Sequence, residues 1–118
     1  MEGRLPMEKP KLQELRTMHA VLCQAIADPT RIALLYELGE GPKHVSDLVE
    51  SLGLPQATVS RHLKVLRDRS LVHSRREGHR VYYRLAYPQV LEALNIMRAI
   101  MTEALAQQHN LAQSIVQK

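Results

Sequence analysis

A three-residue break between two short amphipathic segments constrains the fold of this chain more than any other feature. Residues 45–52 and residues 55–66 both carry apolar side chains at helical spacing. The break reads Gly53-Leu54-Pro55, in which Pro55 is also the first residue of the second segment, and Gly53 can adopt the left-handed conformation that ends a helix. Because this connection is too short for the two helices to run antiparallel, we predict a helix-turn-helix.

The second of these helices has two chemically distinct sides. Val59, Leu63 and Leu66 form an apolar stripe that requires a packing partner. The other side carries residue types that bind DNA, because Gln pairs with adenine, Arg with guanine and Ser with either base, while Lys mostly meets phosphate. Thr58 offers a hydroxyl near the helix start, and Ala57 is small enough to let the backbone approach. An ordinary solvated helix face also carries polar residues, so the neighbouring segments must distinguish the two interpretations. The predicted DNA contacts on this helix are Gln56, Ala57, Thr58, Ser60, Arg61 and Lys64.

A β-hairpin is predicted directly after this helix. Two runs rich in Val, Tyr and Arg, residues 71–76 and 80–85, flank Glu77-Gly78-His79, in which Gly78 is free to take a positive φ. Such a hairpin is typical of a wing that contacts phosphates or a minor groove, although an edge hairpin kept soluble by charge would look similar. The wing interpretation adds Arg75, Arg76, His79 and Arg80 to the predicted DNA contacts.

Positive charge is concentrated in this part of the chain. The net charge of the whole chain is only +4, but residues 54–84 hold eight Arg and Lys residues against Asp68 and Glu77, a net of +6. The remainder is net −2. A concentration of this kind indicates a polyanionic partner, here double-stranded DNA.

The remaining segments predict helices. One is expected over residues 10–27, and a second begins at Asp28-Pro29 and ends before Gly39. A last helix running to about Val116 has more apolar residues than one face needs, and about 29 residues would span roughly 43 Å, more than so small a domain can cover. Packing against the first helix of the same chain would cover part of this surface, and we expect in addition its own copy as a partner in a homodimer. The fold class is mainly α with a small β-hairpin, a winged helix-turn-helix.

Composition sets the wider limits. A chain of 118 residues suits one domain, so we expect a flexible arm over residues 1–9 and a single domain over residues 10–118. With no Phe or Trp, the core must be aliphatic. No apolar run is long enough for a membrane span or a signal peptide, so we expect a cytoplasmic protein with no membrane partner. The single Cys23 excludes an internal disulfide.

The order of these segments and their amino-acid sequences resemble those of the ArsR/SmtB family of winged helix-turn-helix repressors. The resemblance covers roughly residues 18–105. It implies a homodimer joined through the first and last helices, an inverted-repeat operator with one recognition helix per half-site, and release by an inducer. The matching stretches are Ala27–Ile32, Val45–Leu48, Gln56–Leu66 and Arg76–Leu85.

The ligand sets that the family uses to sense metals are not matched here. Arsenic and lead sensors carry Cys-Val-Cys-Asp where this chain has His44-Val45-Ser46-Asp47, so both soft thiolates are missing. The positions of the zinc and nickel ligands correspond to Tyr87, Gln89, Ile100 and Glu103, of which only Glu103 could bind a metal.

One candidate site for a metal ion or a thiol-reactive inducer remains that does not follow the family's ligand sets. His19 and Cys23 lie four residues apart, so on a helix they could hold one ion together, and His109 would approach them if the terminal helices pack as the resemblance implies. Alternatively, His19 and Cys23 belong to an apolar stripe that packs in the core. No other cofactor is expected, and His62 and His73 are interpreted as structural or DNA-facing.

The leading functional hypothesis is a sequence-specific, homodimeric transcriptional repressor. A non-specific architectural DNA-binding protein is the alternative, although it would not need the base-reading types Gln56, Ser60 and Arg61. No Gly-rich phosphate loop and no Ser/His/Asp constellation is present, so an enzyme is not expected. A winged helix that binds another protein through its basic face is a fourth interpretation.

Overall fold

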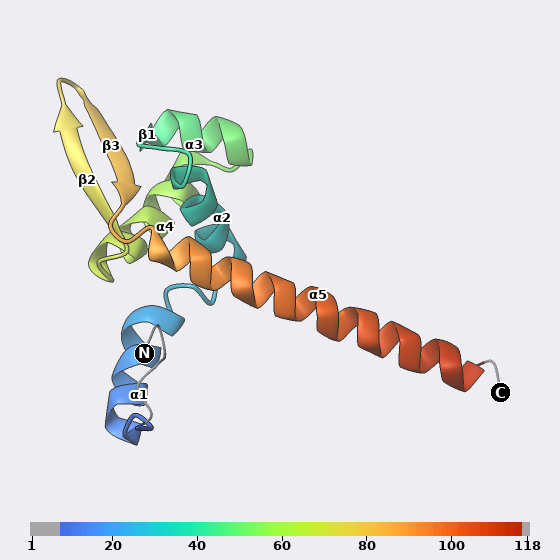
Figure 1. Cartoon of the computed structure of the whole chain (residues 1–118). Helices are drawn as coiled ribbons and strands as arrows, with labels where there is room; N and C mark the ends of the chain where they lie inside the picture. The colour runs from blue at the N-terminus through green and yellow to red at the C-terminus, as the bar shows by residue number, and fades with distance from the viewer. Residues whose placement is uncertain (1–7, 117–118) are drawn as a thin grey trace. The chain divides into compact units, whose positions relative to one another are not determined.

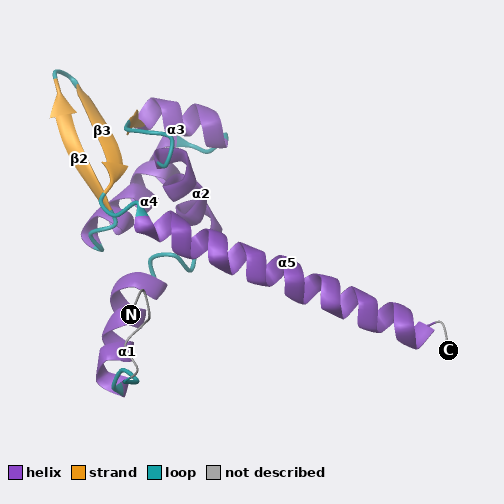
Figure 2. Ribbon diagram, viewed as in Figure 1, coloured by secondary structure: helices purple, strands orange, loops and turns teal. Residues whose placement is uncertain are grey.

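The computed structural model describes residues 8–116, which contain helices, one π-helical turn and three short strands (Figures 1 and 2). Residues 1–7, most of the expected N-terminal arm, lie outside the described part. Within the described part, residues 8–86 form one compact unit and residues 87–116 form another. The elements are α1 (Leu12–Met18), η1 (His19–Cys23), α2 (Pro29–Leu38), β1 (Lys43–His44), α3 (Val45–Leu52), α4 (Gln56–Asp68), β2 (Val72–Glu77), β3 (Arg80–Leu85) and α5 (Gln89–Val116).

Helix α2 begins where its capping residue predicts. Asp28 Oδ1 accepts hydrogen bonds from the backbone N–H groups of Thr30, at 2.8 Å, and Arg31, at 3.3 Å. Pro29 occupies the first helical position, where its missing N–H costs nothing. Burial raises the pKa of the Asp28 carboxyl, but the two backbone donors, Thr30 and Arg31, outweigh it and leave that pKa below its usual value.

Helices α3 and α4 form the predicted helix-turn-helix. His44 and Asp47 cap the start of α3, with the Asp47 carboxylate accepting from the His44 N–H at 3.1 Å and His44 Nδ1 accepting from the Ser46 N–H. Gly53 ends α3 with φ 66° and ψ 31°, the left-handed conformation expected of it. Helix α4 then starts three residues later, at Gln56.

The hairpin forms as predicted, and a third strand joins it. Strands β2 and β3 pair antiparallel around Gly78, which has φ 64°. The two-residue strand β1 pairs with the other edge of β3, placing Lys43 opposite Tyr83 and giving the sheet order β1-β3-β2. Strand β1 was not predicted, because two residues are too few to show an alternating pattern.

The first helical segment differs from the prediction of one helix over residues 10–27. Helix α1 ends at Met18, and His19–Cys23 continue as a π-helical turn in which the Gln24 N–H donates to the His19 carbonyl at 3.0 Å. This turn inserts an extra residue into the hydrogen-bond ladder and shifts the side chains that follow. Sequence periodicity alone did not detect the shift.

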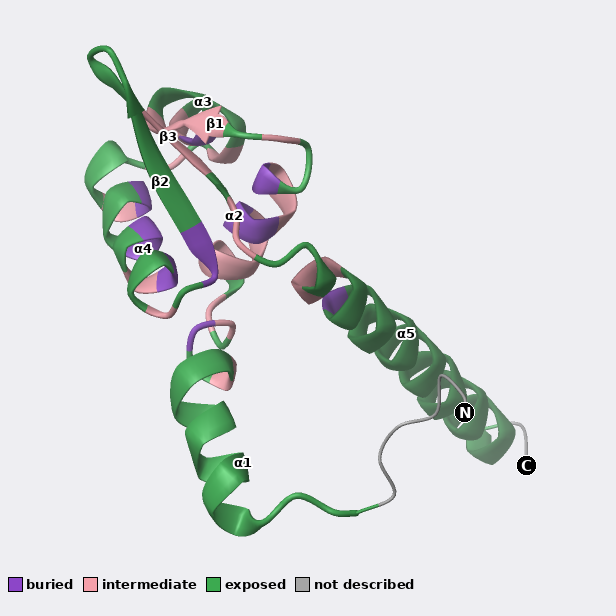
Figure 3. Cartoon of the chain, turned by 60° about the vertical axis from the view of Figure 1, so that its left-hand side comes forward, coloured by how far each residue is buried: buried purple, intermediate pink, exposed green. Residues whose placement is uncertain are grey.

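The core of the first unit is aliphatic, as the composition requires. Its buried side chains come from the inward side of α2 and α4, from α3 and from the start of β2 (Figure 3). Burial of these side chains stabilises the packing of α3 against α4. The fully buried residues are Leu34, Leu35, Leu48, Val59, Leu63, Leu66 and Val72.

Helix α5 makes up nearly all of the second unit and has the predicted extent. Within it only Leu94 is buried, while large apolar side chains such as Ile100, Met101 and Leu105 are more than half exposed. Among the helices described, none is long and apolar enough to cross a membrane.

Candidate nucleic-acid interface

Helix α4 turns its apolar side inward and its polar side outward. Val59, Leu63 and Leu66 are fully buried, and His62 is buried beside them. The predicted contacts on this helix therefore lie on the opposite side, anchored by the core rather than by a loop. Of these, Thr58 is half-buried, and the exposed residues are Gln56, Ala57, Ser60, Arg61 and Lys64.

The first turn of α4 is open to an incoming acceptor. Pro55 occupies the capping position and makes no side-chain cap, and its carbonyl accepts the first helical hydrogen bond, from the Val59 N–H at 3.1 Å. The N–H groups of the first turn carry the positive end of the helix dipole. A DNA phosphate at this end would meet donors and favourable charge together.

Lys64 is paired within the helix. Its ammonium lies 2.9 Å from a carboxylate oxygen of Asp68, one turn further along, and both side chains are mostly exposed. The hydrogen bond from Lys64 holds the pKa of the Asp68 carboxyl below its usual value. Because such exposed pairs contribute little to stability, Lys64 can exchange this carboxylate for a phosphate at small cost.

The strand pleat divides the predicted wing contacts between two faces. Arg75 lies opposite Tyr82 and Arg80 opposite Glu77, so these side chains share one face, whereas Arg76, opposite Val81, lies on the other. His79 belongs to the turn beside Gly78. All four basic residues are exposed, and Nε of Arg75 lies 3.6 Å from Oε2 of Glu77.

The first of these faces also carries residues that were not predicted as DNA contacts. Arg84 follows Arg80 by four residues on β3 and therefore shares its face, with Tyr82 between them. A hollow of about 330 Å³ opens here, lined by Pro42, Arg75, Glu77, Tyr82, Tyr83 and Arg84. The alternation of Arg80, Tyr82 and Arg84 along the strand was the signal that could have revealed this surface.

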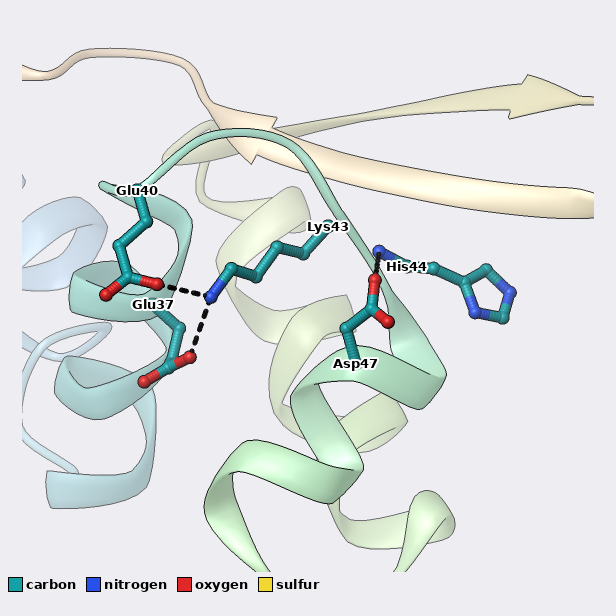
Figure 4. A network of polar contacts seen from close by, with 5 residues as sticks. All are labelled: Glu37, Glu40, Lys43, His44 and Asp47. Carbon is teal, nitrogen blue, oxygen red and sulfur yellow. Dashed lines mark hydrogen bonds and ion pairs between the residues drawn. The ribbon is translucent and has the colours of Figure 1, made fainter.

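An ion-pair network ties the wing sheet to α2. The Lys43 ammonium, from β1, donates to Glu37 at 2.9 Å and to Glu40 at 2.6 Å (Figure 4). Hydrogen bonds to Glu40 and Glu37 raise the pKa of Lys43, and the bond from Lys43 lowers the pKa of Glu37. The edge strand β1 is thereby fixed to the end of α2, and β3 is paired with it.

The residues considered for an inducer site do not form a metal-binding group. His19 is exposed and Cys23 half-buried at the two ends of η1. His109 belongs to the other unit, where its ring lies 3.4 Å from the Gln113 amide. Within residues 8–116 no three His, Cys, Asp or Glu side chains are grouped as metal ligands.

Known proteins resemble this chain in both sequence and fold. The family described as bacterial regulatory protein, arsR family, matches residues 28–74. The biofilm growth-associated repressor of Agrobacterium fabrum is 33% identical over 98 residues, which cover 83% of this chain and 82% of that protein. The HTH-type transcriptional regulator NmtR of Mycobacterium tuberculosis is 36% identical over 95 residues, covering 80% of this chain and 79% of that regulator.

Two solved structures are similar over most of their length. Mycobacterium tuberculosis Rv0081 superposes with a TM-score of 0.71 at 29% identity, covering 86% of this chain and 98% of that one. The homodimeric winged helix-turn-helix DNA-binding domain of Mb0332 from Mycobacterium bovis, a possible ArsR-family regulator, gives a TM-score of 0.69 at 28% identity. The match covers 86% of this chain and 94% of that domain.

Proposed function

Because this chain belongs to the ArsR family of bacterial regulatory proteins, we propose that it is a homodimeric repressor of an inverted-repeat operator in double-stranded DNA. It is a sequence-specific DNA-binding regulator and not an enzyme. The observation that carries the proposal is the outward side of α4, where Gln56, Ser60 and Arg61 are exposed on a helix whose inward side is buried.

The proposed contacts divide into two roles. Gln56, Ser60 and Arg61 read base edges in the major groove, because their side chains offer directed donors and acceptors. Lys64 and the half-buried Thr58 meet phosphates, and the small side chain of Ala57 lets the backbone approach. The wing residues add charge to the same duplex and contribute orientation more than sequence preference. These wing contacts are Arg75, Arg76, His79 and Arg80.

A homodimer follows from the apolar residues that each unit leaves exposed. In the first unit Leu12, Met18 and Leu22 are at least 41% exposed, and α5 carries its own exposed apolar series. The Mb0332 domain with a similar fold is homodimeric. We propose that residues 10–118 act as one winged helix-turn-helix domain whose terminal helices form the dimer interface, so that two copies of α4 address two half-sites.

The chemical class of the inducer is also part of this proposal. A metal ion is a plausible inducer class, since one relative, from Streptomyces lividans, is a probable mercury resistance operon repressor, 34% identical over 80 residues. Since His19, Cys23 and His109 are not grouped as ligands within one described chain, a metal inducer at these residues would require the dimer to bring them together, whereas a thiol-reactive inducer would need Cys23 alone. A regulator of this kind acts in the cytoplasm, where its DNA lies.

The test starts from an unbiased search for the operator. The full chain would select binding sequences from random duplex DNA, and fluorescence anisotropy would compare the recovered sequence with its scrambled version at physiological salt. We expect an inverted repeat bound at least 10³-fold more tightly than scrambled DNA. Equal affinity for the two duplexes would instead support the architectural alternative and remove the repressor function.

A further inference from the structure

Helix α4, the proposed recognition helix, carries a buried polar side chain that DNA contact does not explain. His62 is only 9% exposed and is the one polar residue buried among residues 8–116. It lies on the inward side of α4, next in sequence to the exposed Arg61. A buried imidazole needs a partner, because an unpaired polar group in a core costs free energy.

That partner is Arg31 of α2. Its Nη1 lies 3.2 Å from His62 Nδ1. A guanidinium has only donors, so Nδ1 must accept, which places the ring proton on Nε2 and makes the imidazole neutral. The contact therefore requires one tautomer of His62.

The same guanidinium holds a third segment. Arg31 Nε donates to the Ala25 carbonyl at 2.6 Å, and Nη2 donates to the Gln24 carbonyl at 3.0 Å. Both carbonyls belong to the connection that follows η1. The Arg31 backbone N–H is in turn fixed by Asp28 at the capped start of α2. One planar group thus joins the η1–α2 connection, α2 and α4.

We propose that Arg31 and His62 form a positioning pair that sets the rotation of the recognition helix and couples it to the connection after η1. The inference rests on the proposed function, because it assigns these residues to sequence-specific binding. Neither residue needs to touch DNA. A small rotation of α4 about its axis displaces Gln56 and Arg61 from the base edges, whereas phosphate contacts tolerate it.

The geometry favours orientation over simple stabilisation. Replacing both partners of a buried hydrogen bond by apolar residues often leaves stability unchanged or improves it, so the pair is not needed for stability alone. A planar fork with acceptors on two other segments, in contrast, restricts the direction in which α4 can turn.

The test compares paired variants of the full chain. His62→Leu removes the acceptor and keeps an apolar volume, whereas His62→Asn keeps an acceptor oxygen near the position of Nδ1. Arg31→Met removes the guanidinium and keeps the stem. We expect His62→Leu and Arg31→Met each to lose about tenfold in the ratio of operator to scrambled-DNA affinity, with scrambled-DNA affinity unchanged. His62→Asn should restore most of that ratio.

Two controls separate positioning from general destabilisation. The double variant His62→Leu/Arg31→Met should lose no more than Arg31→Met alone, because Arg31→Met already removes the contact between the two side chains that His62→Leu removes. Leu38→Ala, at the far end of α2 and buried in the same core, should lower thermal stability yet keep the operator preference. Additive losses in the double variant, or an equal loss of preference in Leu38→Ala, would overturn the positioning role.

A measurement on the unaltered protein keeps the proposal testable if a variant does not fold. Long-range ¹H–¹⁵N correlation of the imidazole should show His62 with a protonated Nε2 and an accepting Nδ1 at neutral pH. A protonated Nδ1 would contradict the pairing with Arg31. If wild-type protein does not distinguish operator from scrambled DNA, the proposed function fails, whatever the tautomer of His62.

Discussion

At the scale of single residues, position on an element decides what each basic side chain can do. Arg61 stands on a helix whose other side is buried, so its guanidinium is presented by a fixed support. Arg80 stands on an exposed strand at the hairpin turn. The same side chain is therefore suited to base reading in one place and to phosphate contact in the other.

We expect Arg61→Ala to weaken operator binding by about 1–3 kcal/mol and to relax sequence preference, because a bidentate base contact is lost. Anisotropy titrations on operator and scrambled duplexes would measure both effects. An equal loss on the two duplexes would show that Arg61 does not read bases.

Arg80→Ala should behave differently. It should weaken binding to all duplexes alike and reduce the slope of log affinity against log salt concentration by about one, since one phosphate contact disappears. The same titrations repeated over a salt series give the slope. An unchanged slope would remove Arg80 from the phosphate contacts.

At the scale of elements, helix ends are set by local chemistry. Asp28 caps α2 by accepting from two backbone N–H groups, and Gly53 ends α3 in a left-handed conformation. Both lie within a few residues of the elements they limit, so local sequence was enough to place them. The boundary of the first helical segment lacks such a residue, and its π-helical turn was missed.

Removing the cap at Asp28 should destabilise α2. We expect Asp28→Ala to lower the free energy of unfolding by about 1 kcal/mol at neutral pH. Because the folded-state pKa of Asp28 lies below its usual value of 3.8, this difference is present above that value and is lost as the pH falls through the folded pKa. Urea unfolding at pH 7 and at pH 3 would test it, and a difference that persists undiminished at pH 3 would contradict an ionised cap.

The left-handed Gly53 offers a second test. A Cβ added there would meet no atom within 4 Å, so the cost of Gly53→Ala comes from the backbone alone, roughly 1–2 kcal/mol. Gly39 ends α2 at φ −63°, and Gly39→Ala is the matched control that should not be destabilising on backbone grounds. Thermal unfolding of both variants gives the comparison, and equal effects would argue against a strained left-handed turn.

At the scale of the whole molecule, the protein exposes more large apolar side chains than a soluble monomer usually does. Helix α5 buries only Leu94, while Ile100, Met101 and Leu105 remain more than half exposed. Large exposed apolar surfaces of this kind mark association sites. We connect this surface with the proposed dimer, and hence with the two half-sites of an operator.

Charge on this surface should separate the protomers. We expect Met101→Glu/Leu105→Glu to shift the sedimentation mass from dimer to monomer and to reduce operator affinity more than affinity for a half-site. Gln107→Glu/Gln108→Glu adds the same charge at polar positions of α5 and should leave the dimer intact. A dimer that survives the first substitution would place the interface elsewhere.

The sequence alone was sufficient for the features that local rules govern. Caps, the left-handed Gly53, the hairpin at Gly78 and the two-sided pattern of α4 each depend on residues within one or two turns. The helix-turn-helix and its candidate base-reading face follow from them. The remaining features depend on segments far apart in the chain. The pairing of β1 with β3 and the contact of Arg31 with His62 became visible only in the folded unit, because neither is encoded by neighbouring residues.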